Sequence, residues 1–143
     1  MSGAATATVE LAIVHGTEAV AGWAGGHVVI VDRPEGRAGG MGLGFNGGQL
    51  LALAIGGCLA NDLRDVAHDL GVALGDVRIG VSLDLAGDPL RATGAEISVA
   101  CKTTDGSDPQ PVIDRALAGS TVANSVRRVP CRRPGRAGAA ASV

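Results

Sequence analysis

Aromatic residues are nearly absent from this sequence of 143 residues, which contains Trp23, Phe45 and no tyrosine. Proteins that bind single-stranded nucleic acid stack its bases on aromatic rings, so the composition argues against that class. The 12 basic residues are also balanced by 14 acidic residues, for a net charge of −2. A dedicated nucleic-acid binder normally carries a basic face. We therefore expect no nucleic-acid partner.

Long hydrophobic runs are missing as well. The longest apolar run extends from Leu50 to Ala60 and ends at Asn61 and Asp62. Crossing a bilayer takes roughly 20 apolar residues, so this run predicts a buried helix and no membrane span. The N-terminal residues lack the basic and hydrophobic regions of a secretory signal. These features favour a cytoplasmic protein.

Cysteines are few, and they form no recognisable motif. Cys58, Cys101 and Cys131 are odd in number and widely spaced, which fits neither a disulfide framework nor a zinc site. Free thiols of this kind are typical of a reducing compartment. The three histidines, His15, His27 and His68, form no metal-binding pattern either. We expect neither a metal nor a cofactor.

What the sequence does contain is enough apolar material, 46%, for one well-packed domain. Its charge is unevenly distributed. Residues 1–126 hold all 14 acidic residues and seven basic ones, whereas residues 127–143 hold five arginines and no acid. We expect a single domain over residues 1–128, followed by a basic tail over residues 129–143 that is rich in proline, glycine and alanine.

The first half of the chain predicts three strands and a long helix. Turn residues separate β-type segments over residues 7–15, 18–23 and 27–32, as in an antiparallel meander. A loop rich in proline and glycine follows. Asn46 and Gln49 have the spacing of a capping box, which predicts a helix from there to about Leu70.

The second half predicts a hairpin and two helices. Alternating segments over residues 77–85 and 95–102 flank a turn, and Pro111 is well placed to begin a helix that ends near Ala118. Ser120 can cap a last helix that runs to about Arg128. We expect no regular structure after that helix, because Pro130 and Pro134 interrupt it. Strands and helices are segregated along the chain, so the predicted fold class is α+β.

The glycine-rich loop contains a literal GxGxxG pattern at Gly42, Gly44 and Gly47. A dinucleotide site needs these glycines directly after a strand. Here the predicted strand ends near Asp32, about ten residues too early. We favour a simple loop, and phosphate binding stays open as the weaker interpretation.

Cys58 lies inside the apolar helix, directly after the pair Gly56 and Gly57. A buried cysteine usually acts as a small inert hydrophobe, whereas a reactive one needs a nearby cation, a helix N-terminus or a polar partner. One turn further on are Asn61 and Asp62, and a carboxylate at that place disfavours the thiolate. The residues alone leave the role of Cys58 open. The two glycines would suit close packing against the helix.

These residues resemble those of the OsmC/Ohr family, the osmotically inducible protein C and organic hydroperoxide resistance proteins. In that family, an Asn-Pro-Glu-(Glu/Gln)-Leu segment opens a helix, a small-residue pair and a peroxidatic cysteine follow, and a GxxLxDVxVxV strand comes next. The resemblance covers about residues 18–128. The matching residues are Asn46, Gln49, Leu50, Gly56, Gly57, Cys58, Gly71, Leu74, Asp76 and Val77.

The resemblance implies an OsmC-like α+β fold with N-terminal antiparallel strands, a long central cysteine-bearing helix, a second hairpin and two C-terminal helices. It also implies an intertwined homodimer with the cysteine helices of both subunits packed centrally. The implied activity is thiol-dependent reduction of organic hydroperoxides in oxidative-stress defence. Cys58 would be the nucleophile and become a sulfenic acid. A second cysteine would then form a disulfide with Cys58, and an external dithiol reductant would reduce this disulfide and restore both thiols.

The sequence departs from the family in the residues that support this chemistry. Gly48 stands at the position of the supporting glutamate, and no arginine precedes Arg33. The segment of the resolving cysteine retains Asn124 and Arg127, but Ser120 stands at the position of the cysteine itself. A serine cannot form that disulfide.

Several roles therefore remain open. Gln49, Asn124 and Arg127 are candidates to support the thiolate, with Arg128 as another source of the missing cation. Cys131, eleven residues past Ser120, is a candidate for an alternative resolving cysteine. We expect Cys101 to pack in the core. Two functions follow from the resemblance: a peroxidase that uses Cys58, or a non-catalytic dimer that binds a small apolar ligand in its interfacial pocket.

Overall fold

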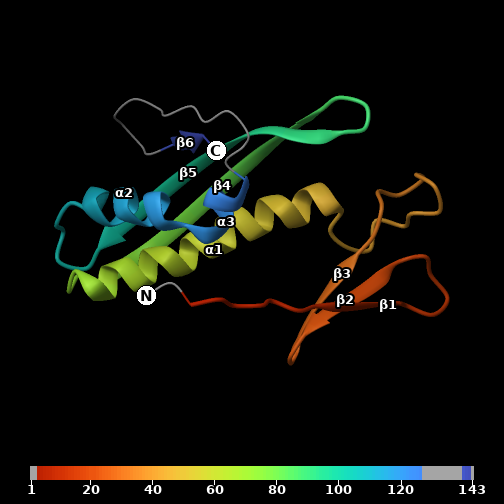
Figure 1. The fold of residues 1–143 in the computed structure, drawn as a ribbon, viewed down its shortest axis with the longest axis horizontal. Coiled ribbons are helices and arrows are strands. Elements are labelled where there is room, and N and C mark those ends of the chain that lie inside the picture. The colour runs from red at the N-terminus through yellow and green to blue at the C-terminus, as the bar shows by residue number, and fades with distance from the viewer. Residues whose placement is uncertain (1–2, 127–139, 143) are drawn as a thin grey trace. The chain divides into compact units, whose positions relative to one another are not determined.

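The computed structural model describes residues 3–126 and 140–142, with the backbone alone considered in the last segment. The chain forms two compact units, Met1–Leu50 and Leu51–Val143. The described residues form three helices and two small antiparallel sheets, an α+β fold that confirms the predicted class (Figure 1). Within the described residues, no helix combines the length and the apolar character that crossing a membrane requires.

The first unit contains the predicted three-stranded meander. Strands β1 (Glu10–Ile13), β2 (Val20–Ala24) and β3 (His27–Val31) pair antiparallel in the order β1-β2-β3. Strand β1 is shorter than the predicted segment over residues 7–15, because its pairing with β2 runs only from Glu10 opposite Trp23 to Ile13 opposite Val20.

After β3, the chain folds back along the edge of the same strand. The backbone N–H of Phe45 donates to the carbonyl of Ile30 at 3.0 Å, and the N–H of Asp32 donates to the carbonyl of Phe45 at 3.0 Å. Gly44 permits this close approach, because a Cβ there would collide with the carbonyl of Ile30. The glycine-rich loop is therefore fixed at the end that leads into the next helix.

Helix α1 (Gly47–Asp69) begins with the predicted capping box. The N–H of Asn46 donates to Oε1 of Gln49 at 3.0 Å, and the N–H of Gln49 donates to Oδ1 of Asn46 at 2.9 Å. At the other end, Gly71 has a φ of +66°, and the N–H of Val72 donates to the carbonyl of Ala67 at 2.8 Å. This is the Schellman arrangement, in which glycine is favoured at the left-handed position.

The second unit is built on a long hairpin of β4 (Leu74–Ala86) and β5 (Arg91–Thr103). Both strands extend beyond their predicted bounds. A third strand, β6 (Ala140–Ser142), pairs antiparallel with β5. The expectation of no regular structure after Pro130 and Pro134 is wrong at this point, because β6 begins six residues beyond Pro134.

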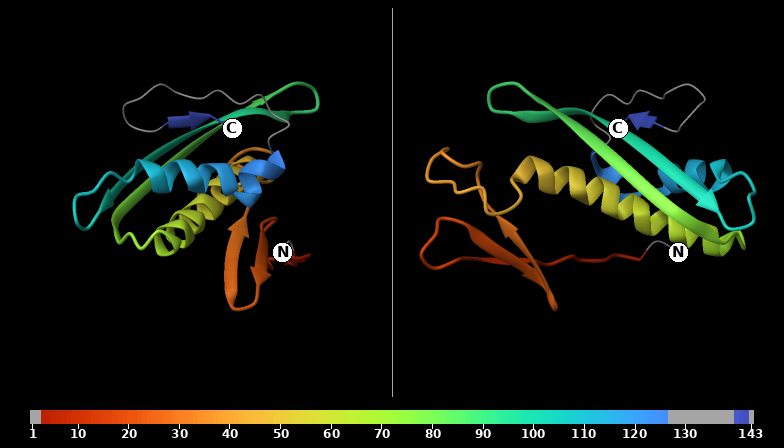
Figure 2. Two further views of the ribbon diagram at one scale, coloured as in Figure 1. Left: turned by 60° about the vertical axis from the view of Figure 1, so that its left-hand side comes forward. Right: turned by 180° about the vertical axis from the view of Figure 1, so that it is seen from behind.

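Helices α2 (Gln110–Gly119) and α3 (Thr121–Val126) complete this unit. Helices α1 and α2 cover one face of the β4–β5 hairpin, as both views of Figure 2 show. Side chains from that face and from the three helices form one apolar core. Its buried members are Ile55, Leu59, Leu63, Ala67, Ala95, Ile97, Val99, Val112, Ile113, Ala116 and Ala123.

The two glycines of α1 have different surroundings within this unit. A Cβ on Gly56 would lie 3.1 Å from Cγ2 of Val81, so Gly56 allows β4 to pack closely against the helix. Gly57 is exposed, and a Cβ there would meet nothing within 4 Å. Close packing inside the chain therefore accounts for Gly56 but not for Gly57.

Candidate functional site

Cys58 lies near the middle of α1, on a half-buried part of the helix surface. Its thiol donates a hydrogen bond to Oδ2 of Asp62 at 3.6 Å. These residues are four apart, so the helix itself brings their side chains together. Cys58 is not a member of the apolar core that the described residues form, whereas Cys101 packs against that core. The sulfur of Cys58 thus faces a polar partner and is partly accessible.

The side chain of Gln49 caps the start of helix α1. Its Oε1 accepts the N–H of Asn46, and its side chain is exposed. Nine residues separate Gln49 from Cys58, about 13 Å along a helix axis. Gly48 is half-buried in the same first turn and has no side chain that could act as an acid or base. Within one chain, therefore, neither position supports the thiol.

Ser120 is fully buried at the junction of α2 and α3, and its hydroxyl has no hydrogen-bond partner among the described residues. Asn124 stabilises the same junction. Its backbone N–H donates to the carbonyl of Ser120 at 2.9 Å, and its Nδ2 donates to the carbonyl of Ala118 at 3.2 Å. The side chain of Asn124 therefore holds the two helices together. Three further candidates, Arg127, Arg128 and Cys131, lie outside the described residues.

Cys101 lies on β5 opposite Val77 and packs against the core. Burial raises the pKa of the Cys101 thiol, and the positive charge of Arg64 opposes this rise. A thiol of this kind is mostly protonated at neutral pH, so Cys101 has the properties of a packing residue.

The glycine-rich loop is organised around the carboxylate of Asp32, which is buried. It accepts the backbone N–H groups of Arg33 at 2.8 Å, Met41 at 3.0 Å and Leu43 at 3.1 Å. The hydrogen bond from Leu43 is the main reason that the pKa of Asp32 is lowered, and burial opposes it. A phosphate would have to compete with this carboxylate for the same amides, so the structure favours the simple loop.

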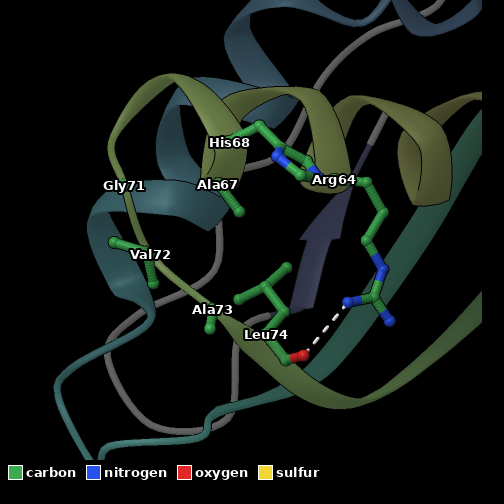
Figure 3. Close-up of a pocket in the computed structure, with 7 residues that line it drawn as sticks. All are labelled: Arg64, Ala67, His68, Gly71, Val72, Ala73 and Leu74. Carbon is green, nitrogen blue, oxygen red and sulfur yellow. Dashed lines mark hydrogen bonds between the residues drawn. The ribbon is translucent and has the colours of Figure 1, made fainter.

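A hollow of about 390 Å³ lies where α1 ends and β4 begins. Its lining residues are Arg64, Ala67, His68, Gly71, Val72, Ala73 and Leu74 (Figure 3). The guanidinium of Arg64 donates to the carbonyls of Leu74 at 3.2 Å and Gly75 at 3.4 Å. Sequence reasoning missed this hollow. The available signal was the pair of basic residues, Arg64 and His68, which are one turn apart just before the helix ends at Asp69.

Acidic, histidine and cysteine side chains do not gather into a metal-binding group anywhere in the part of the chain that the structure describes. The same region contains two ion pairs, Arg33 with Glu18 at 3.3 Å and Arg115 with Asp69 at 3.5 Å, and both are on the surface.

The sequence model for the family described as OsmC-like protein matches residues 39–132, which is more than half of the chain. The chain belongs to this family. The match includes Cys58 and helices α1, α2 and α3. A comparison with curated protein sequences finds no match.

Solved structures of OsmC-like proteins have the same fold. An OsmC-like protein of Vibrio cholerae gives a TM-score of 0.74 at 11% identity, over 86% of this chain and 94% of that one. An organic hydroperoxide resistance protein of Legionella pneumophila gives 0.62 at 19% identity, over 88% and 92%. The organic hydroperoxide resistance protein OhrB of Bacillus subtilis gives 0.58 at 20% identity, over 85% and 90%. At these identities, the likeness shows the fold alone.

Proposed function

We propose that this OsmC-like protein reduces organic hydroperoxides with the thiol of Cys58, in a stress-response role. The main support is the state of Cys58. Cys58 is half-buried, lies outside the apolar core that the described residues form, and contacts the carboxylate of Asp62. It also stands at the position of the peroxidatic cysteine that the family resemblance indicates. Several proteins with this fold are named organic hydroperoxide resistance proteins, which agrees with the proposal.

In the proposed reaction, the sulfur of Cys58 attacks the terminal oxygen of the hydroperoxide. The S–O bond forms as the O–O bond breaks, and the sulfur is oxidised to a sulfenic acid while the hydroperoxide is reduced to an alcohol. The thiol proton leaves the sulfur, and the departing alkoxide gains a proton. Two thiols of an external reductant then reduce the sulfenic acid to the thiol and are themselves oxidised to a disulfide, with loss of water.

The second step must differ from that of the family, because Ser120 has no sulfur. We propose that an external thiol attacks the sulfenic acid directly. Cys131 is the alternative resolving residue within the chain. Arg127 or Arg128 would supply the cation that the N-terminal strands lack. Single substitutions of Cys131, Arg127 and Arg128 test the roles of these residues.

We further propose that the active form is a homodimer with the α1 helices packed centrally. In the three strands of the first unit, only Gly22 is buried, and the large apolar side chains of Leu11, Ile13 and Val28 are 56%, 57% and 68% exposed. A three-stranded sheet needs an apolar face packed against something to be stable. On α1, Leu53 is 52% exposed beside the open position of Gly57. A second copy of the chain would cover such surfaces.

The decisive experiment follows one turnover of the reduced protein with cumene hydroperoxide, using intact mass and the rate of thiol loss. We expect rapid oxidation in the unchanged protein and in Cys101→Ala, and none in Cys58→Ser. In Cys131→Ser, a sulfenic acid in place of a disulfide would identify Cys131 as the resolving residue. Oxidation of the unchanged protein no faster than that of a free cysteine would refute the peroxidase proposal.

One observation favours a ligand-binding function at a different place from the interfacial pocket that the resemblance implies. The hollow at the end of α1 combines apolar side chains, Val72 and Leu74, with the basic groups of Arg64 and His68. That combination suits a small molecule with an apolar body and a carboxylate. If octanoate binds there, calorimetry will show saturable binding that Arg64→Gln weakens and Arg78→Gln, on the exposed face of β4, leaves unchanged. No heat of binding with the unchanged protein would remove this alternative.

A further inference from the structure

We propose that Asp62 is a catalytic residue that moves the proton of the Cys58 thiol to the departing alkoxide. This inference rests on the proposed hydroperoxide reduction and names the group that completes it. It would place one carboxylate beside the thiol in a chain that has Gly48 at the position of the family's supporting glutamate.

The geometry that carries the proposal is the contact between the two side chains. The thiol of Cys58 donates to Oδ2 of Asp62 at 3.6 Å, and both side chains are half-buried. Asp62 forms no ion pair with any basic side chain in residues 3–126, unlike Asp69, which pairs with Arg115. The carboxylate of Asp62 therefore accepts the hydrogen bond of the thiol and has no ion-pair partner among these residues.

The reaction requires this kind of group. A thiol must lose its proton to become a strong nucleophile, and an alkoxide is a poor leaving group unless it gains one. As the sulfur attacks, its proton passes to the carboxylate of Asp62. The resulting carboxylic acid then donates a proton to the oxygen that leaves. Atoms and charge balance, and Asp62 returns to a carboxylate at the end of the step.

A carboxylate beside a thiol also has a simpler effect, since its negative charge disfavours the thiolate. If that were its whole role, replacing Asp62 would make Cys58 more reactive toward every electrophile. The two roles can be separated by the leaving group. Iodide leaves iodoacetamide without a proton, whereas the alkoxide of a hydroperoxide needs one.

The test measures both rates at Cys58 by peptide mass spectrometry in Asp62→Asn, with Asp65→Asn as the matched control. Asp65 is on the same helix and exposed, and it makes no contact with the thiol. In Asp62→Asn we expect the rate with cumene hydroperoxide to fall roughly 100-fold. We expect alkylation by iodoacetamide to rise about two- to fivefold. Asp65→Asn should change neither rate by more than about twofold.

A third variant distinguishes loss of the carboxylate from a general loss of folding. Asp62→Glu keeps a carboxylate on a longer side chain, so it should retain most of the hydroperoxide rate that Asp62→Asn loses. If both rates rise in Asp62→Asn, or if the hydroperoxide rate is unchanged, the relay is wrong although the peroxidase proposal stands. If the unchanged protein reacts with hydroperoxide no faster than free cysteine, both proposals fall together.

Discussion

The carboxylate of Asp32 and the backbone N–H of Leu43 form a hydrogen bond of 3.1 Å across eleven residues of chain. The same oxygen accepts the N–H of Met41 at 3.0 Å. One buried side chain therefore fixes the conformation of the loop that leads from β3 into α1. This arrangement explains why a stretch so rich in glycine has a defined fold.

Replacing Asp32 by Asn should destabilise the protein at neutral pH. It should also make the stability of the protein depend less on pH in the acidic range. These hydrogen bonds lower the pKa of Asp32 in the folded state. A lowered folded-state pKa stabilises the protein above the unfolded value of about 3.9, and this contribution is lost as the pH falls through the folded value. Melting temperatures from pH 7 down to pH 2.5 check this directly.

The difference in melting temperature between the unchanged protein and Asp32→Asn should be constant above about pH 5 and shrink below about pH 4. Asp108→Asn, an exposed substitution in another loop, is the control for loss of one negative charge. A difference that stays constant down to pH 2.5 would contradict the proposed role of the ionised carboxylate.

Local patterns in the sequence predicted much of this fold. The spacing of Asn46 and Gln49 predicted the capping box, and both of its hydrogen bonds are present. The strand β6 has no comparable signal. It consists of Ala140, Ala141 and Ser142, which have no alternating apolar pattern, and it exists because β5 offers an edge for pairing.

The candidate site was predictable to a smaller extent, and the reason is physical. The contact between Cys58 and Asp62 follows from their spacing of four on one helix. The burial of Ser120 depends on how α2 and α3 pack against the core, which no local spacing encodes. The hollow beside Arg64 depends in the same way on where β4 starts relative to the end of α1.

The orphan hydroxyl of Ser120 should cost stability. A fully buried polar group without a partner loses its hydrogen bonds to water, and an apolar replacement of similar shape removes this loss. We expect Ser120→Ala to raise the free energy of unfolding by about 1 kcal/mol. Ser125→Ala is the control, because Ser125 is exposed and its hydroxyl bonds the carbonyl of Thr121.

Chemical denaturation at pH 7 measures both variants. The control should stay within about 0.5 kcal/mol of the unchanged protein. If Ser120→Ala instead lowers the free energy of unfolding by a similar amount, the Ser120 hydroxyl has a hydrogen-bond partner in solution. That partner would be a water molecule or a group of a second subunit.

A cysteine at the Ser120 position tests the family arrangement. The residue is buried at the junction of α2 and α3, and cysteine is close to serine in size, so Ser120→Cys should fold. If Cys58 is the peroxidatic residue, hydroperoxide treatment should yield an intramolecular disulfide between Cys58 and the new thiol. Intact mass would then show a loss of two hydrogen atoms, and peptide mapping would show the linkage.

The double variant with Cys58→Ser should lose this disulfide, whereas the variant with Cys101→Ala should retain it. Persistent sulfenic acid at Cys58, with no disulfide to the introduced thiol, would mean that the two positions do not approach each other as the family resemblance implies.

Gly57 offers a direct test of the proposed dimer. It lies in the interior of α1, and within the described chain an added Cβ would meet nothing within 4 Å. In a monomer, Gly57→Ala should therefore stabilise the helix by about 0.8–1 kcal/mol. In the proposed dimer, the same Cβ intrudes on the partner's helix. Because overpacking costs about 1–3 kcal/mol, we expect the dimer to dissociate at a roughly tenfold higher protein concentration.

Gly56→Ala is the matched comparison, since its added Cβ would meet Val81 of the same chain at 3.1 Å. Its effect on the melting temperature should not depend on protein concentration. The effect of Gly57→Ala should grow as the protein is diluted, because dilution favours the monomer. Sedimentation and melting curves over a hundredfold range of concentration separate the two cases. A gain in stability from Gly57→Ala at every concentration would mean that α1 does not pack against a second copy at this position.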